Sequence, residues 1–128
     1  IKLNVLKEAV AGRRIIMIDD SIVRGTTSAL IVNMLRDAGA REVHVRISAP
    51  PFLHPCYFGT DIPSEDQLIA HGHTVEEIRD MIGADSLSYL KMERLQEMAC
   101  SRSICTACFS GKYPIEPPVE DIRGSYDK

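Results

Sequence analysis

The chain has 128 residues, with 15 Lys and Arg against 18 Asp and Glu, and a formal net charge of −3 at pH 7. Nucleic acid and anionic membranes are bound by a concentrated basic face, whereas the longest basic block here is two residues, so the composition argues against both as partners. No run approaches the about 20 apolar residues of a membrane span. We therefore expect a cytoplasmic protein whose four Cys are reduced thiols or metal ligands.

The first predicted strand leads directly into a polar loop. Residues 15–18 are an apolar, mostly β-branched run between charges, typical of a strand buried on both faces of a parallel sheet. Residues 25–28, Gly-Thr-Thr-Ser, then open a helical pattern. Glycine lets the backbone approach a ligand, hydroxyls and unpaired N–H groups donate, and the helix dipole favours an anion. This junction predicts a cradle for a sugar phosphate.

Asp19 and Asp20 stand between the strand and the loop. Their carboxylates repel a phosphate, so they must contact another part of the ligand. Ribose hydroxyls, or a Mg²⁺ ion carried by a pyrophosphate, are suitable partners. Neighbouring strand residues face opposite ways, so we expect one acid on the ribose and the other orienting the loop or a metal-bound water. The alternative is a polar strand-to-helix turn with an N-cap and no ligand.

A helix and a second strand follow. The helix is predicted from apolar spacing that ends at Gly39; its positions are Thr27, Ile31, Met34, Leu35 and Ala38. Val43, Val45 and Ile47 alternate with polar residues, which predicts a strand with one polar face. A helix between two strands favours a parallel, right-handed crossover.

Residues 50–63 contain four Pro and predict an extended connection. Capping-box spacings at Ser64 with Gln67, and at Thr74 with Glu77, predict two short helices. The second would bury Val75, Ile78 and Ile82 and end at Gly83.

The remaining chain predicts one strand, one helix and a tail. Residues 86–90 form a weak strand pattern, and Met92, Leu95, Met98 and Ala99 have helical spacing typical of core packing. Gly, Pro and charged residues dominate from position 110, which predicts a loosely ordered tail.

Cys105 and Cys108 have chelating spacing, but one such pair is half of a four-ligand site, and Cys56 could add a third thiolate. A redox pair or plain buried thiols remain alternatives. We expect Cys100 to be a small buried hydrophobic residue. His71 and His73, in a Gly-containing turn, are expected to be solvated rather than metal ligands.

The string Ile18-Asp-Asp-Ser-Ile-Val-Arg-Gly-Thr-Thr-Ser28 resembles the phosphoribosyl diphosphate (PRPP) motif of type I phosphoribosyltransferases. The residues of this motif, in this order, are similar to those of the amidophosphoribosyltransferase family. Further similar stretches span residues 48–51, 54–63, 83–90 and 105–109.

This resemblance implies an α/β fold, in which a partial type I phosphoribosyltransferase core over residues 1–49 precedes a mostly helical segment over residues 50–128. It implies the first committed step of purine synthesis, in which 5-phosphoribosylamine forms from PRPP and glutamine-derived ammonia. Members of the family are several times longer. We therefore expect a C-terminal piece, inactive alone, of an enzyme that is a homo-oligomer and is inhibited by purine nucleotides.

The resemblance also implies the site residues. The PRPP contacts would be Asp19, Asp20, Ser21, Arg24, Gly25, Thr26, Thr27 and Ser28. Asp19 and Asp20 would also face Mg²⁺. Cys56, Cys105 and Cys108 would be three ligands of a [4Fe-4S] cluster whose fourth ligand is absent from this chain. No residue is assigned as catalytic, because positioning and charge stabilisation dominate such a reaction.

Three other functions remain open: a nucleobase phosphoribosyltransferase, a non-enzymatic nucleotide-binding regulatory module of the same fold, and a metal-stabilised structural domain with a vestigial cradle.

Overall fold

A computed structural model describes residues 4–62, 64–100 and 102–117, and the structural statements below concern these residues. Three parallel strands form one sheet in the order β1 (Arg14–Asp19), β2 (Glu42–Ile47) and β3 (Ser86–Tyr89). The predicted α/β class and the predicted parallel pairing of the first two strands are confirmed, and β3 adds a second parallel pairing.

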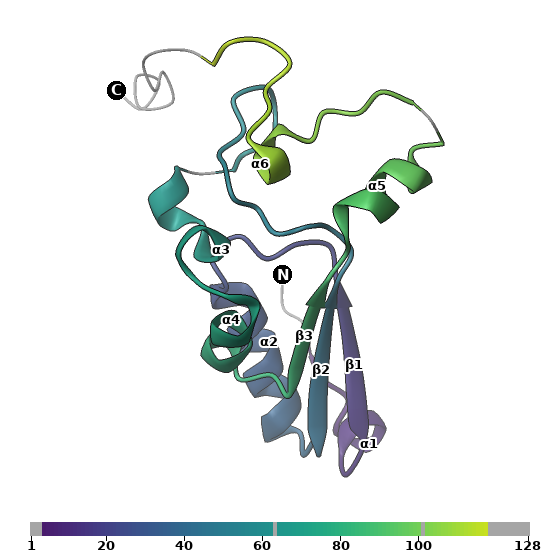
Figure 1. The fold of residues 1–128 in the computed structure, drawn as a ribbon. Coiled ribbons are helices and arrows are strands. Elements are labelled where there is room, and N and C mark those ends of the chain that lie inside the picture. Colours follow the sequence, from purple (N-terminus) through teal and green to yellow (C-terminus); the bar gives the residue numbers. More distant parts are fainter. Residues whose placement is uncertain (1–3, 63, 101, 118–128) are drawn as a thin grey trace.

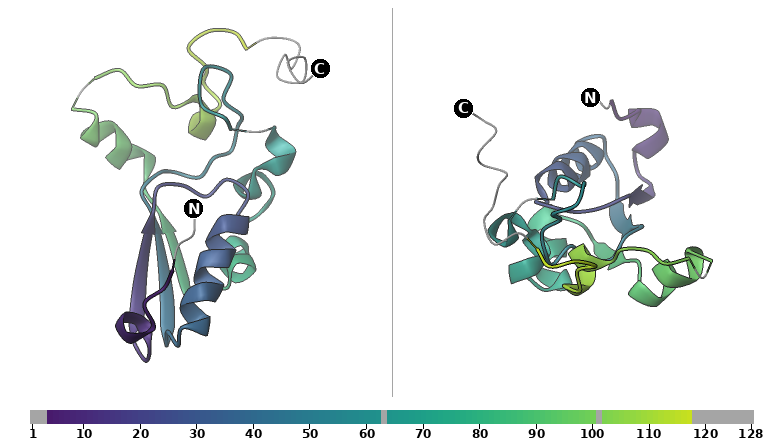
Figure 2. Two further views of the ribbon diagram at one scale, coloured as in Figure 1. Left: turned by 180° about the vertical axis from the view of Figure 1, so that it is seen from behind. Right: turned by 90° about the horizontal axis from the view of Figure 1, so that it is seen from above.

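Two pairs of helices lie in different parts of the molecule (Figures 1 and 2). Helices α2 (Thr26–Asp37) and α4 (Val75–Ile82) cover one face of the sheet. Helices α5 (Met92–Met98) and α6 (Ala107–Ser110) lie beyond the carboxyl ends of the strands. The remaining elements are α1 (Lys7–Val10), the 3₁₀ helix η1 (Glu65–Gln67) and α3 (Ile69–Gly72). None of the helices described is long and apolar enough to cross a membrane.

The core lies between the sheet and the two covering helices. Met17, Val45 and Leu87 are aligned across the three strands and are buried. They pack in one cluster with side chains from the helices, which include Val32 of α2 and Ile78 of α4. Burial of this apolar face holds both crossover units against the sheet.

The second face of β1 is exposed, so the prediction of a strand buried on both faces is wrong. Ile16 is 67% exposed and Ile18 is 76% exposed. β1 is an edge strand, and both covering helices pack on the other face of the sheet. An apolar run therefore indicated a strand correctly but did not indicate what covers it.

The ends of the helices can be compared with the capping residues predicted from the sequence. α2 is followed by Gly39 with φ +94°, and α4 begins at a complete capping box between Thr74 and Glu77, as predicted. Ser64 makes no side-chain capping bond at η1, so the capping box predicted there is wrong. Val75 was predicted to be buried but is 36% exposed.

The packing predicted for α5 is also wrong. The helix forms, but none of its residues is buried, and Met98 is 68% exposed. Cys100 is exposed rather than buried, with φ +50° just after the helix. The cause is the place of α5 beyond the end of the sheet, away from the core (Figure 1). Residues 111–117 contain no helix or strand, and the rest of the predicted tail lies outside the described residues.

Candidate functional site

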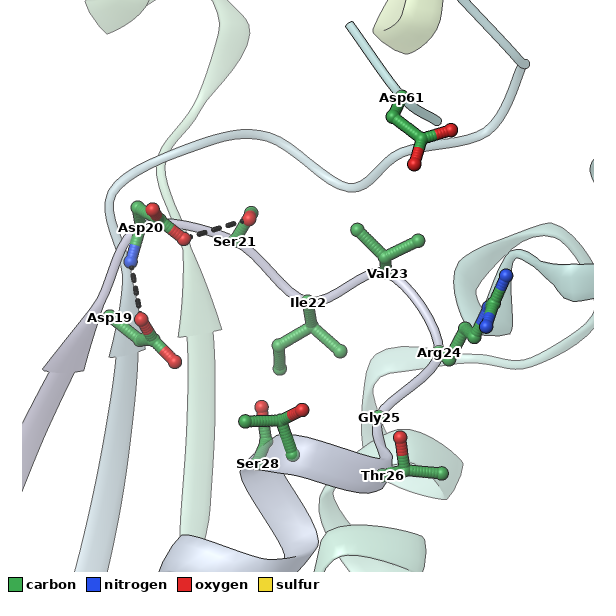
Figure 3. A pocket seen from close by; sticks show the side chains of 11 residues that line it. Asp19, Asp20, Ser21, Ile22, Val23, Arg24, Gly25, Thr26, Ser28 and Asp61 are labelled. Atoms are coloured by element: carbon green, nitrogen blue, oxygen red, sulfur yellow. Dashed lines mark hydrogen bonds between the residues drawn. The ribbon is translucent and has the colours of Figure 1, made fainter. Parts of the chain in front are cut away.

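A pocket of about 470 Å³ lies where β1 gives way to α2 (Figure 3). The structure brings all of the predicted PRPP contacts to this one pocket. They are Asp19, Asp20, Ser21, Arg24, Gly25, Thr26, Thr27 and Ser28. The pocket therefore lies at the carboxyl edge of a parallel sheet, where open α/β folds bind ligands.

The loop between β1 and α2 is held in place by the core and by α3. Ile22 is 2% exposed and belongs to the core cluster. The carbonyl oxygen of Val23 accepts a hydrogen bond of 2.9 Å from the N–H of Ile69, the first residue of α3. Gly25 has φ +81°, and a Cβ at this position would lie 2.7 Å from Cδ1 of Ile69. The loop is thus fixed by its own buried residue and by α3.

The amino end of α2 supplies donors to the pocket. Gly25 is the N-cap and makes no side-chain cap, while its carbonyl accepts the first helical bond, from the N–H of Ala29 at 2.9 Å. The N–H groups of Thr26, Thr27 and Ser28 have no carbonyl one turn earlier in the helix. Together with the positive end of the helix dipole, these groups suit an anion.

The two acids help to order the loop. The N–H of Asp20 donates to Oδ1 of Asp19 at 2.9 Å, and the hydroxyl of Ser21 donates to Oδ1 of Asp20 at 2.8 Å (Figure 3). The carbonyl of Asp19 accepts from the N–H of Ser48, at 2.9 Å. Among the described residues, Oδ2 of each carboxylate has no hydrogen-bond partner, so it can accept a hydrogen bond from a ligand.

Asp61 also lines the pocket, and sequence reasoning assigned it no role. It comes from the extended connection and faces the pocket from the side away from α2 (Figure 3). Residues 50–62 contain no helix or strand, as predicted. The position of Asp61 depends on how the extended connection folds back across the edge of the sheet, and no local sequence pattern predicts that.

The two cysteine-bearing segments pack against each other. The N–H groups of Leu53 and His54 both donate to the carbonyl oxygen of Cys108, at 2.9 and 3.0 Å. Phe52 stacks on Phe109 with ring centroids 5.0 Å apart. The structure therefore places the segment that carries Cys56 beside α6, which carries Cys108.

The thiols of these segments differ in their electrostatics. Burial raises the pKa of Cys108 to about 11, and the neighbouring Cys56 and Cys105 add to this shift. Burial also acts to raise the pKa of Cys56, but backbone donors led by the N–H of Phe58, together with the Thr60 hydroxyl, bring it below its ordinary value. All four Cys are free of disulfides. Within the described part of the chain, no three His, Cys, Asp or Glu side chains are gathered for a metal ion.

No family model matches the chain. It is similar to the amidophosphoribosyltransferase of Archaeoglobus fulgidus, with 53% identity over 127 residues, 96% of this chain and 28% of the relative. The amidophosphoribosyltransferase of Synechococcus elongatus is 57% identical over 125 residues, 95% of this chain and 25% of the relative.

The fold gives the same result. It is similar to a solved structure of glutamine phosphoribosylpyrophosphate amidotransferase from Bacillus subtilis complexed with ADP and GMP, with a TM-score of 0.82 and 50% identity, covering 91% of this chain and 27% of that one. The chain thus spans about a quarter of the length of the relatives it matches. By sequence and by fold, it belongs to the amidophosphoribosyltransferase family.

Proposed function

We propose that the pocket binds the ribose 5-phosphate part of PRPP. The chain would then supply this part of an enzyme that makes 5-phosphoribosylamine from PRPP and glutamine-derived ammonia. The observation that carries the proposal is the stretch of residues 19–28, which combines two acids, a left-handed glycine and an uncapped helix start around one pocket. Family membership supports it, as does the binding of nucleotides, which also carry a ribose phosphate, by the Bacillus relative.

Each side of the pocket has a role in this proposal. The amides and hydroxyls of Thr26, Thr27 and Ser28 hold the 5-phosphate. Asp19 and Asp20 accept hydrogen bonds from the ribose hydroxyls and face the Mg²⁺ that accompanies the diphosphate. Positive charge develops on the ribose ring as the diphosphate leaves carbon 1, and the two carboxylates stabilise that charge.

We also propose that Cys56, Cys105 and Cys108 hold a [4Fe-4S] cluster, with the fourth ligand supplied from outside this chain. Two observations support this proposal. The two segments pack against each other, and Cys56 and Cys105 both raise the pKa of Cys108. Each cysteine of such a cluster binds a different iron atom, so the ligands need not converge as they do on a single ion. The bound cluster would supply structural cross-linking between the extended connection and α6.

Calorimetry with PRPP and Mg²⁺ tests the pocket. We expect Asp20→Asn to weaken binding by about 10-fold, because it removes a charged acceptor of ribose hydroxyls. Asp37→Asn is the matched control, since Asp37 is an exposed acid at the far end of α2. Equal affinities of the Asp20→Asn variant and the unaltered chain would contradict the proposal.

A chimera tests the reaction. In it, this chain replaces the corresponding quarter of the Bacillus subtilis relative, and glutamine-dependent formation of phosphoribosylamine is measured with iron and sulfide content. Turnover with bound iron is expected, whereas the chain by itself should show none. Binding of PRPP without turnover would indicate a regulatory module. Turnover with a purine or pyrimidine base instead of ammonia would indicate a nucleobase transferase.

A further inference from the structure

One carboxylate, that of Glu65 in η1, lies between two histidines. Its Oε1 accepts a hydrogen bond from Nδ1 of His54 at 3.1 Å. Its Oε2 lies 3.5 Å from Nε2 of His71 in α3. The other ring nitrogen of His71, Nδ1, donates to the carbonyl oxygen of Leu53 at 2.9 Å. Glu65 and His71 thus join α3 to residues 53 and 54 of the extended connection.

The α3 side of this link leads to the loop of residues 20–25 between β1 and α2, which we call the phosphate loop. α3 begins at Ile69, whose N–H donates to the carbonyl oxygen of Val23 at 2.9 Å. The side chain of Ile69 fills the space that a Cβ at Gly25 would need. A shift of α3 would therefore move the loop that lines the pocket.

The other side of the link rests on α6. The N–H groups of Leu53 and His54 share the carbonyl of Cys108. The ring of His54 lies against Gly111, where an added Cβ would be 2.9 Å from Nε2 of His54. His54 is thereby held by backbone from two directions, so it gives Glu65 a fixed point of attachment.

We propose that Glu65 is a positioning residue for PRPP binding: by holding α3 against residues 53 and 54, it keeps the phosphate loop in its binding shape. Glu65 is not among the residues that line the pocket, so its effect passes through α3. The inference rests on the proposed function for its ligand. Because the side chains of the link are partly exposed, its contribution is moderate.

The test compares three variants of the full chain. Glu65→Ala removes the link. Glu65→Gln keeps the length of the side chain and an oxygen that can accept a hydrogen bond from Nδ1 of His54. Asp66→Ala is the control, because Asp66 is an exposed acid in the same turn. Calorimetry measures PRPP binding with Mg²⁺, and hydrogen exchange measures the amide of Ile69 against that of Val45 in the central strand.

We expect Glu65→Ala to weaken PRPP binding about 5-fold and to speed exchange at Ile69 while Val45 is unchanged. Glu65→Gln should restore both values, and Asp66→Ala should change neither. Unchanged affinity and unchanged exchange in Glu65→Ala would overturn the inference, as would a Glu65→Gln variant that behaves like Glu65→Ala. If the unaltered chain fails to bind PRPP, the proposed function fails, whereas exchange at Ile69 still tests the link.

Discussion

Gly25 meets two independent demands at the residue scale. Its φ of +81° is in the left-handed region, where a residue with a side chain would be strained. Its missing Cβ also leaves room for Ile69. The first demand shapes the turn into α2, and the second lets α3 close against the loop.

We expect Gly25→Ala to lower the free energy of unfolding by about 2–4 kcal/mol, because strain and a clash with Ile69 add together. Gly12→Ala is the matched control: Gly12 also has a positive φ, +73°, but a Cβ there would meet nothing within 4 Å. Its loss should be about 1 kcal/mol, from strain alone. Urea unfolding measures both variants, and equal losses would show that Ile69 yields without cost.

At the scale of single elements, local patterns predicted what forms better than what is buried. The spacing in α4 and the alternation in β2 are short-range properties, and both elements appear where the sequence placed them. Exposure of Ile18, Met98 and Cys100 depends on which elements cover them, and that is set by distant parts of the chain. The same distinction holds for the pocket. The string from Asp19 to Ser28 is continuous and was predicted, whereas Asp61 arrives through a fold-back of the connection.

A second junction lies at the opposite end of the sheet from the pocket. Oδ2 of Asp85 accepts from the N–H of Val43 at 2.6 Å and from Nη2 of Arg36 at 2.9 Å. Arg36 also donates to the carbonyl of Gly83 at 2.7 Å. One carboxylate thus connects the carboxyl end of α2 to β2 and to the turn before β3.

This junction predicts a dependence of stability on pH. The bond from Val43, with Arg36 adding to it, lowers the pKa of Asp85 below its ordinary value although partial burial acts in the opposite direction. A lowered pKa favours the charged form in the folded state, so the stabilisation is complete above the unfolded pKa of about 3.9 and is lost as the pH falls through the lower folded value.

We expect Asp85→Asn to cost about 1 kcal/mol at neutral pH and to flatten the decline in stability below about pH 4. Asp80→Asn removes only a surface pair with Arg79, so it should cost less than about 0.5 kcal/mol. Urea unfolding at pH 7 and pH 3 measures both. A steep acid decline that persists in Asp85→Asn would assign the pH dependence to other carboxylates.

At the scale of the whole molecule, the sheet has one covered and one open face. Ile16 and Ile18 project from edge strand β1 on the open face, in line with the polar His44 and Arg46 of β2. An exposed edge strand with apolar side chains is a site for association.

The isolated chain should therefore self-associate as its concentration rises. We expect the double variant Ile16→Thr with Ile18→Thr to reduce this association, since threonine keeps the strand propensity but removes apolar surface. Leu30→Thr changes one exposed residue on α2 and should have no effect. Sedimentation velocity over a concentration series compares the three, and equal association of the double variant would place the contact elsewhere.

The sharing of the Cys108 carbonyl by Leu53 and His54 has a consequence for biosynthesis. Every described residue that lines the pocket precedes position 62, so the ribosome adds all of them before it adds Cys105 and Cys108. Chains emerge amino end first, so the N–H groups of Leu53 and His54 have no α6 to meet until residues 107–110 have been made. Pairing of the cysteine-bearing segments therefore follows synthesis of the pocket residues, and a metal held by both segments could bind only after that pairing.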